Sequence, residues 1–323
     1  MVDSLFLQQR QLQRNWLCFL TLLLLVLFVL SLVVGPISLH QLWANDGSSA
    51  LAQQVLLQLR LPRACLAVLL GAGLAMSGCV LQTLLHNPLA EPGLIGVSSG
   101  ASLMAVLALF VSQQLGYLLP PWGLSLSAFL GALLVTGTLL LLSRRGRLDN
   151  VRLLLLGVAI GICGSAVTTW LLYFSNDQSL REIMFWMMGS LAYGQTQPAW
   201  WWLPYLAVMG WLLMRRQALS LLQLGDAQAQ LMGLDLQRLR WQLVLAVCLL
   251  SGLAVAMAGS IGFIGLLIPH LMRLLGRGSA HFVLGASLLA GASTLLLADL
   301  LSRNILPSGE LPVGIVTATL GAP

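Results

Sequence analysis

The segment ACLAVLLGAGLAMSGCVLQTLL (residues 64–85) decides the fold, because none of its side chains carries a charge. A helix that crosses a bilayer needs about 20 apolar residues at about 1.5 Å each. Further uncharged stretches occupy residues 92–143, 153–176, 241–272 and 282–298. With 58% hydrophobic and 8% charged residues in 323 positions, the sequence predicts an all-α, polytopic membrane protein of about ten transmembrane helices.

Hydropathy predicts one transmembrane domain over residues 1–323, interrupted by a polar cytoplasmic segment at about 215–240. The triplet GLA at 73–75 recurs at 252–254, in spans that run in opposite directions, which hints at an inverted internal repeat. So short a match in this composition can also arise by chance. The expected spans are 16–34, 64–85, 93–112, 122–142, 153–174, 199–214, 242–259 and 282–301, with two shorter segments at 261–275 and 311–323.

The distribution of arginine predicts the orientation, since the chain contains no lysine and all 16 basic residues are arginine. Four of them, at positions 60, 63, 181 and 303, fall outside if the N-terminus is cytoplasmic. Positive charge is enriched in cytoplasmic loops, so we expect a multi-pass protein of the bacterial inner membrane with a cytoplasmic N-terminus. The arginines then placed inside are Arg10, Arg14, Arg144, Arg145, Arg147, Arg152, Arg215, Arg216, Arg238, Arg240, Arg273 and Arg277.

The missing lysine also excludes two kinds of chemistry. A phosphate-binding P-loop requires a lysine, and Schiff-base catalysis requires a side-chain amine, so any ATP must be hydrolysed by another chain. The five cysteines show no CxxC spacing, and His270 has no second ligand at a useful distance in the sequence. We therefore expect no catalytic residue, no metal site and no cofactor in this chain. The arginines cluster at the ends of spans, which does not indicate a nucleic-acid partner.

The polar segment 215–240, called the coupling segment below, has leucines recurring around Gly225-Asp226-Ala227. This pattern predicts two short amphipathic helices with breaks at Gly225 and Gly233. Such helices either lie on membrane lipid or dock a soluble partner, and we favour a partner.

Two further motifs each allow a structural and a functional interpretation. In the inner turn HNPLAEPG (86–93), two prolines restrict the backbone, so the turn either joins two helices or narrows a pathway. In the span 153–174, the small residues Gly157, Gly161, Ser165 and Thr168 allow close helix packing or line a solvated passage. The structural interpretation is the more common one in both cases.

Three arginines run against the topological bias. Arg60 and Arg63 lie at the outer end of the second span, and Arg303 lies at the outer end of the ninth. We expect them to be exposed charges that either snorkel to the interface or meet an acidic partner.

Four segments, spread over essentially the whole chain, resemble one known protein family. NPLAEPG (87–93), GSIGFIGLLIPH (259–270), LAD (297–299) and ELPVGIVTATLGAP (310–323) resemble the permease subunits of the importers for iron-siderophore, haem and cobalamin. Within this family, RLPR (60–63), MFWMMGS (184–190) and QQRQ (8–11) are most similar to the vitamin B12 (cobalamin) importers. The resemblance implies ATP-driven import of vitamin B12 from periplasm to cytoplasm, with a ferric-siderophore or haem permease as the alternative.

A function of another class, ion-coupled secondary transport, would require a charged residue deep in a span, and only Asp299 comes close. The resemblance implies instead a homodimer of ten-helix subunits in membrane lipid, with the passage along the dimer axis. Two copies of a cytoplasmic ATPase subunit would lie below it and a periplasmic substrate-binding protein above. It also implies a last helix that is longer than residues 311–323 provide.

The resemblance assigns roles to three sets of residues. The ATPase would dock on the coupling loop at Leu224, Gly225, Asp226, Ala227, Leu231 and Gly233, and the binding protein on Arg60, Arg63 and Arg303. An inner gate would lie in the loops 87–89 and 149–151, although Asp149, Asn150 and Val151 replace the small hydroxyl residues that are usual in the second loop. The candidate gate and pathway residues are Asn87, Leu89, Asn150, Val151, Gly161, Ser165 and Thr168.

Overall fold

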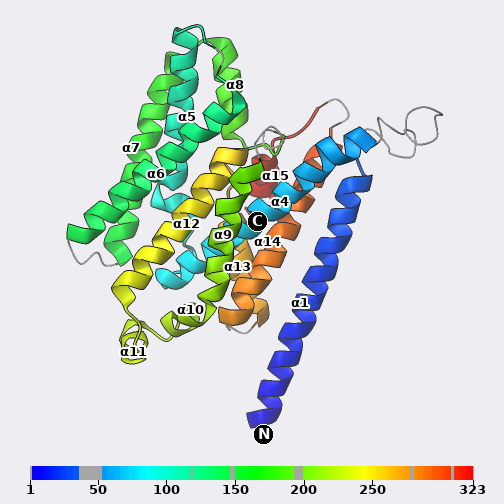
Figure 1. Ribbon diagram of the computed structural model, residues 1–323, viewed down its shortest axis with the longest axis vertical. Coiled ribbons are helices and arrows are strands. Elements are labelled where there is room, and N and C mark those ends of the chain that lie inside the picture. The colour runs from blue at the N-terminus through cyan, green and yellow to red at the C-terminus, as the bar shows by residue number, and fades with distance from the viewer. Residues whose placement is uncertain are drawn as a thin grey trace, which may run out of the picture.

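The computed structural model describes residues 2–35, 53–117, 119–145, 150–192, 199–276, 280–306 and 309–322, and these ranges contain helices and no strand (Figure 1). The expected all-α fold is therefore confirmed, and each expected span corresponds to one helix. These helices are α1 (Val2–Val33), α4 (Leu61–Leu84), α5 (Val97–Gln114), α6 (Pro121–Arg145), α7 (Asn150–Tyr173), α9 (Trp202–Met214), α12 (Leu236–Ala258), α13 (Ile264–Gly276), α14 (Ala280–Asn304) and α15 (Val313–Gly321).

Seven of the helices in the described ranges are long and apolar enough to cross a membrane. The helices α9, α13 and α15 have 13, 13 and 9 residues, which is short of the length that a straight crossing needs. Hydropathy located the spans, but several helix ends differ from the expectation. The first helix begins at Val2 instead of residue 16, and α5 begins only at Val97, because a short 3-10 turn (Pro92–Ile95) precedes it.

The helix α4 lies at the centre of the fold, and glycines let its neighbours approach closely. A Cβ atom added at Gly71 would collide with the carbonyl oxygen of Gly291 in α14, and one added at Gly78 would collide with Gly265 in α13. Contact between backbones at this range is what small residues permit in membrane helices. The small side chains of the segment that decided the fold therefore pack α4 between α13 and α14.

The helix α12 runs opposite to α4 and packs against both α4 and α6 (Figure 1). Its Gly252, the counterpart of Gly73 in the suspected repeat, leaves no room for a Cβ atom beside Ala132 of α6. Gly73 packs in the same way against the ring of Tyr205 in α9. The opposite directions of α4 and α12 fit an inverted repeat, which stays a prediction.

Short helices occupy the two ends of the molecule. In the coupling segment, α10 (Arg216–Leu222) and α11 (Asp226–Leu231) lie at the same end as the N-terminus, here called the inner end (Figure 1). These are the two short helices that the leucine pattern predicts. At the opposite, outer end, α8 (Asp177–Met187) was not expected. It begins where the side chain of Asn176 accepts a hydrogen bond from the amide of Ser179 at 3.0 Å.

Candidate functional site

The three outer arginines are buried, so the expectation that they are exposed charges is wrong. Arg60 ends a π-helical turn (Val55–Arg60) before α4, Arg63 lies in the first turn of α4, and Arg303 lies in the last turn of α14. Their exposed fractions are 5%, 5% and 6%. Buried charges need partners within the protein, and the sequence had not identified these partners.

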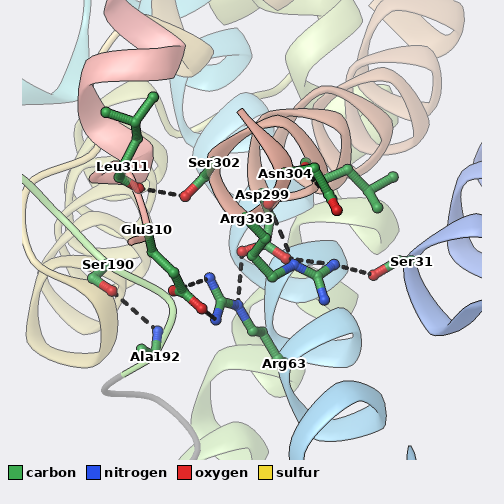
Figure 2. Close-up of polar contacts among 11 residues, drawn as sticks. Ser31, Arg63, Ser190, Ala192, Asp299, Ser302, Arg303, Asn304, Glu310 and Leu311 are labelled. Carbon is green, nitrogen blue, oxygen red and sulfur yellow. Dashed lines mark hydrogen bonds and ion pairs between the residues drawn. The ribbon is translucent and has the colours of Figure 1, made fainter. Parts of the chain in front are cut away.

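Asp299 is the buried partner that two of the arginines share (Figure 2). The Nε atom of Arg63 donates a hydrogen bond to Oδ1 of Asp299 at 2.8 Å, and Nη2 of Arg303 lies 3.1 Å from Oδ2. Arg303 also donates to the hydroxyl oxygen of Ser31 in α1 at 2.9 Å. The carboxylate of Asp299 therefore ties α4 to α14, while Arg303 extends the tie to α1.

Glu310, in the segment that leads into α15, completes the group that we call the outer charge cluster: Arg63, Asp299, Arg303 and Glu310. Its carboxylate meets the guanidinium of Arg63 end-on, at the two terminal nitrogen atoms. Nη1 donates to Oε1 at 3.0 Å, and Nη2 lies 2.9 Å from Oε2. The side chain of Glu310 is 44% exposed, whereas that of Asp299 is 0% exposed. Arg63 thus bridges a fully buried carboxylate and a half-exposed one.

The segment beside Glu310 is also fixed through its backbone. The amide of Leu311 donates to the carbonyl of Ser302 at 3.0 Å, and the hydroxyl of Ser302 donates to the carbonyl of Leu311 (Figure 2). The amide of Val313 donates to the carbonyl of Gly189, in the turn after α8. The start of α15 is therefore held to α14 and to this turn without the side chain of Glu310.

Arg60 has a different role in this region. Its Nη1 atom donates to the carbonyl oxygens of Leu32 and Val33, at 2.8 and 2.9 Å, in the last turn of α1. The last carbonyl groups of a helix have no partner within the helix and carry partial negative charge. Arg60 therefore caps α1 and joins it to the start of α4.

The inner turn contacts the coupling segment directly. The side chain of Asn87 accepts a hydrogen bond from the amide of Leu89 at 3.0 Å, which closes the turn. Nε2 of His86 lies 3.0 Å from the carbonyl oxygen of Leu222, at the end of α10. His86 adopts a left-handed backbone conformation with φ of 49°, which is unusual for a residue other than glycine. The two candidate gate residues therefore lie next to a contact that leads to the coupling segment.

Glu91 fixes the other end of the inner turn, which sequence reasoning missed. Its Oε1 atom accepts a hydrogen bond from the amide of Phe263 at 2.9 Å, at the residue before α13. Phe263 has a φ of 69°. A carboxylate at a helix N-terminus satisfies free amides there. The motifs NPLAEPG and GSIGFIG, which are distant in the sequence, thus meet at this bond.

The small residues of α7 mostly pack against the turn before α5. A Cβ atom added at Gly157 would contact the backbone of Ile95, and Gly96 closely approaches the backbone of Gly157 and Gly161. The hydroxyl of Thr168 is buried and donates to a carbonyl of its own helix. Packing therefore accounts for Gly157, whereas a Cβ atom added at Gly161 would make only ordinary contacts with Ser99 and Gly96. Gly161 and Thr168 stay predicted pathway residues.

Unlike Gly157 and Thr168, Ser165 lies on the exposed side of α7. It stays a predicted pathway residue. The expected second gate loop is only partly described: Asp149 lies outside the described residues, and Asn150 and Val151 already belong to the first turn of α7.

The coupling segment presents apolar side chains at the inner end. Leu224, Leu231 and Met232 are exposed, as is Ala227, and Leu231 reaches 89%. The segment breaks at Gly225 and Gly233, where φ is 100° and 85°, as the sequence predicts.

An ion pair links the two helices at the end of this segment. Asp226, at the start of α11, pairs with Arg240 in α12. This pair links α11 to a helix that packs against α4.

Comparison with known proteins decides the family. Residues 21–323 match the sequence profile of the FecCD transport family. The chain belongs to this family. The vitamin B12 import system permease protein BtuC of Serratia proteamaculans is 48% identical over 316 residues, which cover 98% of this FecCD chain and 92% of that protein. The protein of the same name from Klebsiella pneumoniae is 46% identical over 325 residues, with coverage of 100% and 95%.

A solved structure supports the same fold for this FecCD protein. It is described as an inward-facing conformation of a metal-chelate type ABC transporter, and it superimposes with a TM-score of 0.81 at 34% sequence identity. The match covers 96% of this chain and 97% of the other. The FecCD chain is therefore a multi-pass permease subunit of an ABC importer.

Proposed function

We propose that this permease is the translocation subunit of an ATP-driven importer that carries vitamin B12 from the periplasm to the cytoplasm. The observation that carries the proposal is the similarity, over nearly the whole chain, to two vitamin B12 import permeases. Ferric-siderophore or haem import is the second candidate, because the matched structure is of the metal-chelate type. Ion-coupled transport is disfavoured, since the buried charge of Asp299 is already neutralised by Arg63 and Arg303.

The inner partner is an ATPase subunit that docks on the coupling segment. Exposed apolar side chains on an otherwise polar segment support this assignment, because such patches mark interaction sites. ATP would be bound and hydrolysed by the partner, and this chain would hold no cofactor. Two permease copies present two coupling segments, so the assembly would contain two ATPase subunits.

The outer partner is a periplasmic substrate-binding protein that docks near the outer charge cluster and Arg60. A homodimer would place the exposed face of α7, with Ser165, around the passage. The surplus of arginine toward the inner end supports a cytoplasmic N-terminus in the bacterial inner membrane. Lipid would cover the remaining apolar surface.

Uptake by cells tests the substrate. The gene is expressed in a bacterial strain that lacks its own vitamin B12 permease but keeps the other importer subunits. Labelled cobalamin should accumulate, while ferric siderophores and haem should not. Accumulation of a ferric chelate without cobalamin would establish the second candidate instead. Membrane insertion is checked by immunoblotting of the membrane fraction.

Substitutions in the coupling segment test the ATPase partner. Leu231→Glu adds a charge at an exposed apolar position and should abolish co-purification of the ATPase. Gln230→Glu adds the same charge at the neighbouring exposed position of α11 and serves as the control. If both variants retain the ATPase equally well, this surface is not the docking site.

Gly233 tests whether the segment transmits motion. A Cβ atom there would meet nothing within 4 Å inside the subunit, although the positive φ makes a side chain unfavourable by about 1 kcal/mol. Gly233→Trp should therefore insert into the membrane normally and yet impair uptake. Normal uptake with a normally bound ATPase would contradict a transmitting role.

A further inference from the structure

The outer charge cluster raises a steric problem for docking. Arg63 is only 5% exposed, and its guanidinium is enclosed by Asp299 on one side and Glu310 on the other. Figure 2 shows Glu310 placed against both terminal nitrogen atoms of Arg63. A carboxylate of an outer partner therefore cannot pair with Arg63 while Glu310 keeps its place.

We infer that Glu310 is a built-in substitute for the carboxylate of the outer partner: it pairs with Arg63 in the undocked permease and is displaced when an acidic partner docks. This inference rests on the proposed outer partner. The family resemblance assigns no role to Glu310. In the order proposed here, Glu310 leaves Arg63 first and the carboxylate of the partner then takes its place. Glu310 would thereby lower the affinity for partners that lack a suitably placed acidic residue.

The carboxylates of Asp299 and Glu310 differ in burial and in the number of their partners, as a displacement of Glu310 alone requires. Asp299 is fully buried and shared by two arginines, so removing it would leave uncompensated charge inside the protein. Glu310 is half exposed and pairs with Arg63 alone among the described residues. Water can solvate the carboxylate of Glu310 when it leaves, and the buried Arg63 keeps Asp299 as its counter-ion. Glu310 can therefore leave Arg63 at low cost, while Asp299 stays and keeps the guanidinium in position.

The backbone around Glu310 allows this exchange without a large rearrangement. Leu311 is held to Ser302 by two hydrogen bonds, and Val313 is held to Gly189 by a third. None of these bonds involves the carboxylate of Glu310. Only the side chain of Glu310 has to rotate.

Binding kinetics test the exchange. The permease with its ATPase is placed in nanodiscs, and binding of the substrate-binding protein of the same importer is measured at low and high salt. Glu310→Gln keeps the shape of the side chain but removes the competing charge. It should tighten binding by up to about fivefold, the equivalent of one exposed ion pair. The gain should persist at high salt, because it comes from local competition.

Two variants serve as controls. Glu182→Gln removes the same charge from an exposed position of α8 at the outer end, so it reports the general effect of charge, which should vanish at high salt. Arg63→Ala should weaken binding, and thermal melting verifies that each variant is folded.

The outcomes separate the inference from the proposed function. If Glu310→Gln binds no more tightly than Glu182→Gln, while Arg63→Ala weakens binding, the exchange is wrong and the docking site stands. If Glu310→Gln weakens binding, Glu310 itself holds the partner and the exchange is also wrong. If the unaltered permease does not bind the substrate-binding protein, the outer partner and the exchange fail together.

Discussion

Removing the charge of Asp299 is the substitution whose effect on the free energy of unfolding follows most clearly from the structure. In Asp299→Asn the side chain keeps its shape, but Arg303 loses its counter-ion and keeps only neutral partners, the hydroxyl of Ser31 and, at 3.4 Å, the backbone carbonyl of residue 299. Arg63 still has Glu310. Breaking a buried ion pair by removing one partner costs about 3–5 kcal/mol. We therefore expect Asp299→Asn to lower the free energy of unfolding by about 3–5 kcal/mol. Glu310→Gln should lower it less, because Arg63 keeps the buried Asp299 and the glutamate side chain is half exposed.

The assay is reversible unfolding of the purified permease in mixed micelles, followed by circular dichroism. A second variant makes the test specific: Arg303→Met removes the cation that Asp299→Asn leaves uncompensated. Because the two residues are in contact, the double variant should lose less stability than the sum of the single losses. Additive losses, or an Asp299→Asn variant as stable as Glu310→Gln, would refute the assignment of Asp299 as the buried anchor.

Three further predictions concern the links between elements. Asp226→Arg and Arg240→Asp should each reduce ATP-dependent uptake, and the double exchange should restore it, while stability changes by only about 0–1 kcal/mol because the pair is partly exposed. Glu91→Ala should lower stability by about 1 kcal/mol in the same unfolding assay, whereas Glu91→Gln keeps an oxygen for the amide before α13 and should lose less. Gly291→Val should lower the free energy of unfolding by about 1–3 kcal/mol, because the larger side chain overpacks against α4. Gly285→Val lies on the same helix but meets open space, so its melting temperature should be close to that of the unaltered protein.

Much of the fold follows from hydropathy, because a lipid environment requires long apolar helices and so leaves a strong signal in the sequence. The glycine breaks of the coupling segment were also predictable. Gly225 and Gly233 adopt positive φ angles that other residues rarely adopt. The polar helix α8 was missed because hydropathy gives no signal for a helix that does not cross the membrane.

The candidate site was harder to predict, since its contacts are not local. Arg63 and Asp299 are 236 positions apart, and no periodicity connects them. The spacing of Asp299 and Arg303, one helical turn, was the one local signal for the pair. In α7 the small residues favour packing by sequence but leave a pathway open, and the contact of Gly157 with Ile95 assigns that part of the face to packing.

Transport in proteoliposomes tests the central claim most directly. The permease is reconstituted with its ATPase and the substrate-binding protein, and ATP is supplied on the side of the coupling segment. The account predicts accumulation of labelled cobalamin that requires ATP and the binding protein and continues when ion gradients are dissipated. Accumulation driven by an ion gradient without ATP, or transport of a ferric chelate in place of cobalamin, would contradict it.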